Sequence, residues 1–126
     1  MKNENGRFSA SLEDYLEAIY FVGQKNDVVR ITDIAVMLGI SKSSVNRAIN
    51  TLKAQNLVFH ERYGALQLTA EGYQIAENVA KRHGILKRFL TEILKVDKDR
   101  AEHEACQIEH SLSMDTILKI SKLLDD

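Results

Sequence analysis

Apolar residues recur at helical spacing near the start of the chain. Leu12, Leu16 and Ile19 stand four and three residues apart, which is the pattern of a helix with one buried face. Residues 12–24 are therefore predicted to form an amphipathic α-helix. The polar face of this helix carries two carboxylates, Asp14 and Glu17.

Two shorter helical patterns follow, with a tight connection between them. Thr32 is placed to cap the first, which stops at Gly39, because Thr favours the N-cap and Gly favours the position after a helix. Ser41 is placed to cap the second pattern. A helix end at Gly39 followed two residues later by the N-cap of another helix is typical of a helix-turn-helix.

A short alternating segment comes after this helix-turn-helix. Residues 57–59 are apolar, and beyond a turn near Gly64 the apolar Leu66 and Leu68 flank a polar residue. Such alternation predicts the two strands of a hairpin. A helix-turn-helix followed by a small hairpin predicts a winged helix with a two-stranded wing.

The rest of the chain is predicted to be helical. Residues 69–94 form one long apolar pattern that Thr69 is placed to cap, and the helix is either unbroken or bent at Gly84. A further helix is predicted to begin at Asp97 or Asp99, and a last one to be capped by Ser113. The fold class is therefore mainly α.

Composition agrees with a mainly helical globular protein. The 126 residues include no proline, 44% are hydrophobic and 28% are charged, which indicates an ordered chain. The single cysteine excludes an internal disulfide, and no apolar run approaches the roughly 20 residues that span a bilayer. Without a secretory signal or a membrane segment, the protein is expected to be cytoplasmic.

The third predicted helix is basic, although the net charge of the chain is −1. Between positions 41 and 56 it has no acidic residue and three cations, Lys42, Arg47 and Lys53. Its first turn offers hydroxyl and backbone N–H groups that suit phosphates, and later positions suit base edges in the major groove. A basic face is often only solvated, but its place between a helix-turn-helix and a wing favours DNA binding. The predicted DNA contacts are Ser41, Lys42, Ser43, Ser44, Asn46, Arg47 and Arg62.

A second group of polar residues near the C-terminus predicts a metal site. Cys106, Glu109 and His110 stand at i, i+3 and i+4, so on a helix they share one face, away from the apolar one. Thiolate, carboxylate and imidazole are ligands of first-row transition metals. Three ligands from one helix leave the coordination sphere incomplete. The candidate partners are Asp14, Glu17 and His83.

The same residues leave two other functions open. A winged helix also serves regulators that sense a small molecule, and a cysteine near a histidine, as Cys106 is near His110, also serves thiol redox switches. The metalloprotease spacing HExxH is absent, so the chain is not expected to be an enzyme.

Several stretches together resemble the diphtheria toxin repressor family of metal-dependent transcriptional regulators, and its manganese-transport-regulator branch in particular. These stretches run through nearly the whole chain. They are EDYLEAIY at 13–20, DIA at 33–35, SSV at 43–45, Leu68-Thr69 with Gly72, His83, and EACQIEH at 104–110 with Ser113.

The resemblance implies a winged-helix DNA-binding domain over residues 1–74 and a helical dimerisation and metal-binding domain over residues 75–126. The resemblance also implies a ligand set. Six metal-ligand positions of the manganese branch correspond to six residues of this chain, and each of these has a carboxylate, imidazole or thiol side chain. Cys106 stands where that branch has a carboxylate, and Asp14 stands where the iron-responsive branch has Met. The resemblance therefore implies a divalent transition metal, Mn²⁺ or Fe²⁺. The six positions are Asp14, Glu17, His83, Cys106, Glu109 and His110.

These observations lead to one hypothesis of function. A divalent metal links the first helix to the C-terminal helices and fixes the winged helix for binding to double-stranded operator DNA. The chain is expected to act as a homodimer through its C-terminal helices. The expected output is repression of metal-uptake genes when metal is bound.

Overall fold

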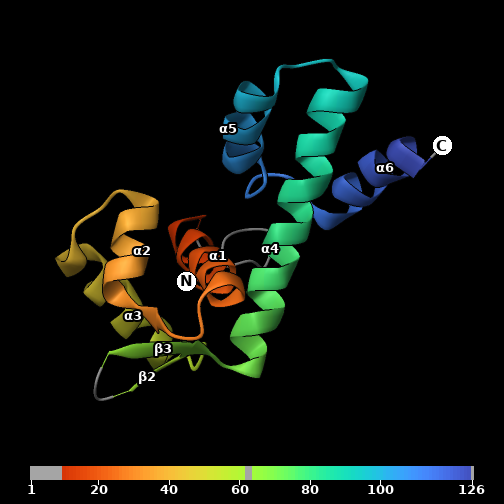
Figure 1. Cartoon of the computed structure of the whole chain (residues 1–126). Helices are drawn as coiled ribbons and strands as arrows, with labels where there is room; N and C mark the ends of the chain where they lie inside the picture. The colour runs from red at the N-terminus through yellow and green to blue at the C-terminus, as the bar shows by residue number, and fades with distance from the viewer. Residues whose placement is uncertain (1–9, 62–63, 126) are drawn as a thin grey trace. The chain divides into compact units, whose positions relative to one another are not determined.

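In a computed structural model of the chain, the structure describes residues 10–61 and 64–125. The chain divides between Glu77 and Asn78 into two compact units. The helix α4 (Ala70–Arg88) begins in the first unit and ends in the second (Figure 1).

The first unit contains a helix-turn-helix and a small sheet. The helices α2 and α3 contact each other, and both contact α1, as Figure 1 shows. The elements of this unit before α4 are α1 (Ala10–Lys25), β1 (Val29–Arg30), α2 (Ile31–Leu38), α3 (Lys42–Ala54), β2 (Val58–His60) and β3 (Ala65–Leu68).

The sheet is antiparallel, with the strand order β1-β3-β2. In the predicted wing, Val58 of β2 pairs with Leu68 of β3, and His60 pairs with Leu66. The two-stranded wing is therefore confirmed. The third strand, β1, was not predicted because its two residues are too few to show an alternating pattern.

The connection between α2 and α3 follows the predicted signals. Gly39 ends α2 in the left-handed conformation at φ +67°, which glycine adopts without a steric penalty. The Ser41 hydroxyl accepts a hydrogen bond of 3.1 Å from the backbone N–H of Ser44, so it is the N-cap of α3.

The predicted N-cap of α2 was wrong. Arg30, not Thr32, is the cap residue. The Asp33 carboxylate accepts a hydrogen bond of 2.9 Å from the backbone N–H of Arg30. Strand β1 passes directly into α2, so the helix begins before Thr32 and that side chain lies inside its first turn.

Thr69 connects the start of α4 to the end of α3. Its hydroxyl donates a hydrogen bond of 2.9 Å to the carbonyl of Asn56 and accepts one of 3.0 Å from the N–H of Gly72. The carbonyl of Leu57 accepts a further hydrogen bond of 3.0 Å from the N–H of Thr69. The predicted cap at Thr69 is therefore confirmed, and it also anchors α4 on the first unit.

Each unit has its own apolar core. In the first, Leu16, Ile34 and Ile49 are fully buried, and Leu52 and Leu57 pack with them. This cluster joins the predicted faces of the first three helices to the hairpin. It therefore positions α3, with its basic residues, on the rest of the winged helix.

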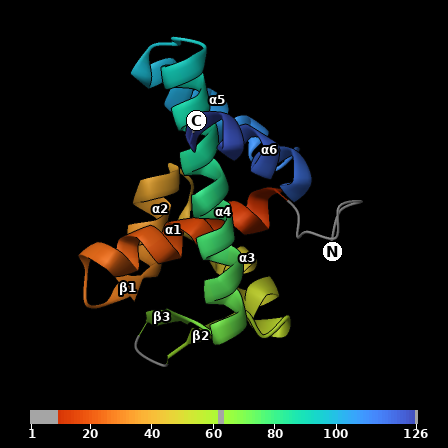
Figure 2. The same cartoon turned by 90° about the vertical axis from the view of Figure 1, so that its right-hand side faces the viewer.

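The second unit is helical throughout its described elements. Besides the end of α4 it contains a π-helical turn, η1 (Phe89–Ile93), then α5 (Lys98–Ile108) and α6 (Met114–Asp125). Both α5 and α6 contact η1, and Figure 2 shows them beside the C-terminal end of α4. Their core consists of Leu86, Leu90, Ala101, Ala105 and Ile117.

The ends of these helices resolve the alternatives left by the sequence. Helix α4 continues through Gly84 to Arg88, and the π-helical η1 follows it directly. Asp97 rather than Asp99 caps α5, since its carboxylate accepts a hydrogen bond of 3.1 Å from the N–H of Arg100. Ser113 caps α6 as predicted. None of the helices in the described part of the chain is long and apolar enough to cross a membrane.

Candidate metal centre

A buried carboxylate lies at the end of α5. The Glu109 side chain is 0% exposed, and its Oε1 lies 2.6 Å from Nδ1 of His83 on α4. Its Oε2 lies 3.7 Å from Nε2 of the buried His110. Burying a carboxylate is costly unless charged or hydrogen-bonding groups surround it. The second unit therefore brings together three of the predicted ligands.

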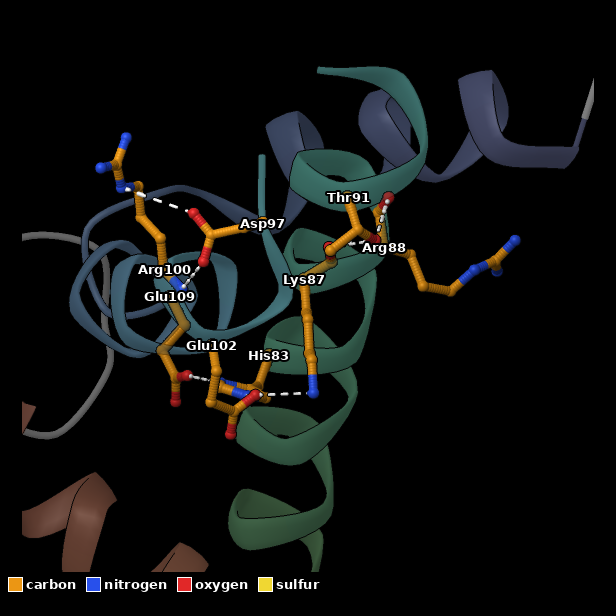
Figure 3. Close-up of polar contacts among 8 residues, drawn as sticks. All are labelled: His83, Lys87, Arg88, Thr91, Asp97, Arg100, Glu102 and Glu109. Carbon is orange, nitrogen blue, oxygen red and sulfur yellow. Dashed lines mark hydrogen bonds and ion pairs between the residues drawn. The ribbon is translucent and has the colours of Figure 1, made fainter. Parts of the chain in front are cut away.

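The other ring nitrogen of His83 faces a second carboxylate. Nε2 of His83 lies 2.9 Å from Oε2 of Glu102, and Nζ of Lys87 lies 3.0 Å from the same oxygen. Figure 3 shows His83 with Glu109 at one nitrogen and Glu102 at the other. The imidazole is thus held between two carboxylates.

This arrangement determines the charge of His83 in the metal-free protein. The hydrogen bond with Glu109, and less strongly that with Glu102, raises the pKa of His83 to about 9 against the opposing effect of burial. Partial burial acts to raise the pKa of Glu102, but hydrogen bonds from His83 and Lys87 lower it. A metal ion that binds His83 therefore has to displace a proton.

Arg82 supports the turn that carries Glu109. Its side chain is 1% exposed, and its Nη1 donates a hydrogen bond of 3.1 Å to the carbonyl of Glu109. Carbonyls at a helix C-terminus lack partners within the helix, so this bond fixes the end of α5. Arg82 was not predicted as a site residue, because in the sequence a cation beside Lys81 and His83 is typical of a solvated face.

Cys106 differs in burial from the two residues predicted to share its face. Cys106 is exposed on α5, whereas Glu109 and His110 are buried. Helix α5 ends at Ile108 with Glu109 as its C-cap, and the N–H of Glu109 still bonds to the carbonyl of Ala105 as in a helix. That the three residues share one face stays a prediction.

The two α1 carboxylates lie one turn apart in the first unit. Glu17 is buried, with 8% exposure, and Asp14 is half-buried. Their neighbour Glu13 is 1% exposed and was not predicted as a site residue. Carboxylates on a solvent-exposed helix face are normally exposed, so the burial of Glu13 and Glu17 is unusual.

The predicted DNA contacts lie mainly on the surface of α3. Lys42, Asn46 and Arg47 are exposed, and Nη2 of Arg47 donates a hydrogen bond of 3.4 Å to the Ser44 hydroxyl. The Ser41 hydroxyl is engaged as the cap, and Ser43 is exposed beside it. Arg62 lies outside the described residues.

The donor set fits a divalent transition metal. A buried carboxylate with an imidazole at each oxygen supplies hard oxygen and borderline nitrogen ligands, which suit Mn²⁺, Fe²⁺ and Zn²⁺. Three donors are fewer than the coordination number of these ions, so a complete site needs further ligands. A winged helix joined to such a helical unit defines a DNA-binding regulator with a metal site.

Comparison with known proteins identifies the family. Residues 7–66 match the family model of the iron dependent repressor N-terminal DNA binding domain, and residues 69–126 match that of its metal binding and dimerisation domain. The chain belongs to this family of metal-responsive DNA-binding repressors, as the resemblance to diphtheria toxin repressor implied, and its members are transcriptional regulators rather than enzymes.

Individual relatives agree with the family models. An HTH-type transcriptional regulator of Methanocaldococcus jannaschii is 38% identical over 116 residues, which cover 91% of this chain and 92% of the relative. The HTH-type transcriptional regulator MntR of Bacillus subtilis is 34% identical over 114 residues, which cover 90% of this chain and 80% of MntR.

Two solved structures have the same fold. A manganese-dependent transcriptional repressor in complex with manganese is 32% identical, with a TM-score of 0.82, and the match covers 90% of this chain and 52% of the repressor. The manganese regulator SloR is 25% identical, with a TM-score of 0.81, and the match covers 90% and 53%. This chain spans about half the length of these two solved structures.

Proposed function

We propose that the chain is a homodimeric repressor of metal-uptake genes that acts in the cytoplasm and binds its operator when Mn²⁺ or Fe²⁺ is bound. The observation that carries this proposal is the fully buried Glu109 between His83 and His110. A buried carboxylate between two imidazoles has the chemistry of a metal site. The solved repressor in complex with manganese and the manganese regulator SloR support manganese as the ion.

Further ligands come from α1 and α5 in this proposal. Carboxylates at Asp14 and Glu17, one helical turn apart, offer oxygen ligands that suit Mn²⁺, and a thiolate at Cys106 shifts the preference toward softer ions such as Fe²⁺. Metal binding through α1 links the winged-helix domain, residues 1–74, to the domain of residues 75–126. The proposed ligands are Asp14, Glu17, His83, Cys106, Glu109 and His110.

The same proposal assigns DNA recognition to α3 and the wing. The first turn of α3 contacts phosphates with its N–H groups and hydroxyls, and Asn46 and Arg47 reach base edges in the major groove. Two copies of α3 in a dimer match two half-sites of an operator. The proposed DNA contacts are Ser41, Lys42, Ser43, Ser44, Asn46, Arg47 and Arg62.

Dimerisation is proposed to use the second unit. Leu94, Leu118 and Leu123 are more than half exposed in the single chain, and all three lie in its C-terminal helices or beside them. Large exposed apolar side chains of this kind mark a surface that another molecule covers. A second copy of the chain is the proposed occupant.

Metal and DNA binding are then thermodynamically linked. Metal selects the arrangement of the two domains that fits the operator, and DNA in turn tightens metal binding by the same factor. The test is a measurement of operator binding. The operator is first selected by the protein from a random DNA library in the presence of Mn²⁺, and binding to it is then measured by fluorescence anisotropy. Binding should rise on addition of Mn²⁺ or Fe²⁺ and fall with chelator. Equal binding after chelation contradicts the proposal.

Replacing Arg47 with Ala is expected to weaken operator binding and relax the preference for one base pair, since a lost base contact costs about 1–3 kcal/mol. Replacing Lys42 with Ala should weaken binding to all sequences alike and reduce the slope of log affinity against log salt by about 1. Anisotropy titrations across salt concentrations measure both. Lys98→Ala is the control, because Lys98 is an exposed cation on α5. If the affinity of Arg47→Ala for operator DNA is unchanged, α3 is excluded as the recognition helix.

Replacing Cys106 with Ser is expected to preserve a weakened metal response. The remaining carboxylates and imidazoles still bind metal, but loss of the thiolate should reduce affinity more for Fe²⁺ or Co²⁺ than for Mn²⁺. Operator binding at increasing concentrations of each ion measures this difference. A thiol redox switch would instead lose its response to peroxide and keep full metal affinity.

A further inference from the structure

His83 is fixed at both ring nitrogens by residues of the second unit. Nδ1 lies 2.6 Å from Oε1 of Glu109, and Nε2 lies 2.9 Å from Oε2 of Glu102. Glu102 is itself held by Lys87, whose Nζ is 3.0 Å from the same Oε2. Lys87, Glu102, His83 and Glu109 thus form one continuous row (Figure 3).

We propose that Glu102 is the positioning residue that makes His83 a metal ligand through Nδ1. Glu102 accepts the Nε2–H of the neutral imidazole, so the lone pair of that ring lies on Nδ1, on the side of Glu109. Metal-bound histidines commonly donate their other N–H to a carboxylate in this way. The inference rests on the metal-dependent function proposed above and adds to it the residue that sets the tautomer.

The surroundings of the two carboxylates separate their roles. Glu109 is 0% exposed and lies next to His110, so its oxygens are close to another ligand. The Glu102 side chain is 54% exposed, and its Oε2 already receives both the imidazole and the ammonium. A divalent cation at that oxygen would be repelled by the Lys87 ammonium. Glu102 is therefore an acceptor for His83 and not a ligand.

The direct test is the state of the His83 ring in the Zn²⁺-bound protein. Zn²⁺ is diamagnetic, so ¹⁵N NMR of the imidazole identifies which nitrogen binds metal and which carries the proton. The chain has four histidines, and a His83→Gln variant assigns the signal. The expected result is a metal-bound Nδ1 and a protonated Nε2.

Variants of Glu102 test the same inference by affinity. Glu102→Ala should weaken Mn²⁺ binding about 10- to 100-fold, the usual effect of losing a residue that orients a ligand. Glu102→Gln keeps an acceptor oxygen for Nε2–H and should stay within a few-fold of wild type. Calorimetric titration with Mn²⁺ measures all variants. Because Glu102 is largely exposed, the thermal midpoints of the metal-free variants should remain close to wild type.

Glu92→Ala is the matched control. Glu92 pairs with Arg88 on the surface and is 52% exposed, so its loss removes the same charge without touching His83. It should bind Mn²⁺ like wild type. If Glu102→Ala and Glu92→Ala lose affinity equally, Glu102 acts only through its charge and the inference is overturned.

The possible failures are distinguishable. A wild-type protein that binds neither Zn²⁺ nor Mn²⁺ overturns both the proposed function and this inference. A wild-type protein that binds metal through Nε2 of His83, or a Glu102→Ala variant with unchanged affinity, overturns this inference and leaves the proposed function standing.

Discussion

Replacing Glu109 with Gln is expected to abolish metal-dependent operator binding. The substitution keeps the size of the side chain but removes the negative charge that lies within 4 Å of both His83 and His110. Loss of a residue that only orients a ligand reduces metal affinity about 10- to 100-fold, so loss of a buried anionic ligand should exceed about 100-fold. Calorimetric titration with Mn²⁺ and anisotropy on operator DNA measure the two effects.

The metal-free Glu109→Gln protein should still fold. With a neutral amide at position 109, the hydrogen bond that most raises the pKa of His83 is weakened, so His83 can lose its proton instead of remaining an unpaired charge. The backbone carbonyl that Arg82 holds is unchanged. Asp99→Asn is a suitable control, since Asp99 is an exposed carboxylate on α5 and its change should leave metal-dependent binding intact. Operator binding by Glu109→Gln that still responds fully to Mn²⁺ would exclude Glu109 as a ligand.

Much of the fold could be predicted from the sequence because its signals are local. Gly39, Ser41 and Ser113 each act on backbone groups within a few residues, so their identity and position suffice to place a helix end. The start of α2 was wrong because its cap depends on a two-residue strand. That strand exists only through pairing with β3, more than 30 residues away in sequence.

The candidate site was less predictable because its geometry depends on distant contacts. Helical spacing placed Glu109 on a polar face, yet the side chain is fully buried, since burial depends on which elements pack over the end of α5. The pairing of His83 with Glu102 joins residues 19 positions apart, which no periodicity within one helix can show. The hydrogen bond from Arg82 to Glu109 likewise joins residues 27 positions apart, so only the fold shows that this member of a basic run is buried.

Replacing Gly72 with Ala is expected to destabilise the winged helix by about 2 kcal/mol, the upper end of the overpacking cost less the gain in helix propensity. A Cβ atom at this position would overlap the backbone carbonyl oxygen of Leu57 and lie 3.0 Å from its carbonyl carbon. Backbone cannot rotate away as a flexible side chain can, so α4 has to move. That movement strains the hydrogen bond from Thr69 to the same carbonyl. Overpacking of this kind costs about 1–3 kcal/mol or more, against about 1 kcal/mol gained from the helix propensity of Ala.

Gly84 provides the matched control in the same helix. A Cβ atom there would meet nothing within 4 Å, so Gly84→Ala should gain up to about 1 kcal/mol from helix propensity alone. Urea unfolding of the two metal-free variants should therefore shift the midpoint in opposite directions. If Gly72→Ala is instead as stable as Gly84→Ala, the start of α4 does not pack against Leu57. The hydrogen bonds of Thr69 would then not be what anchors α4 to the first unit.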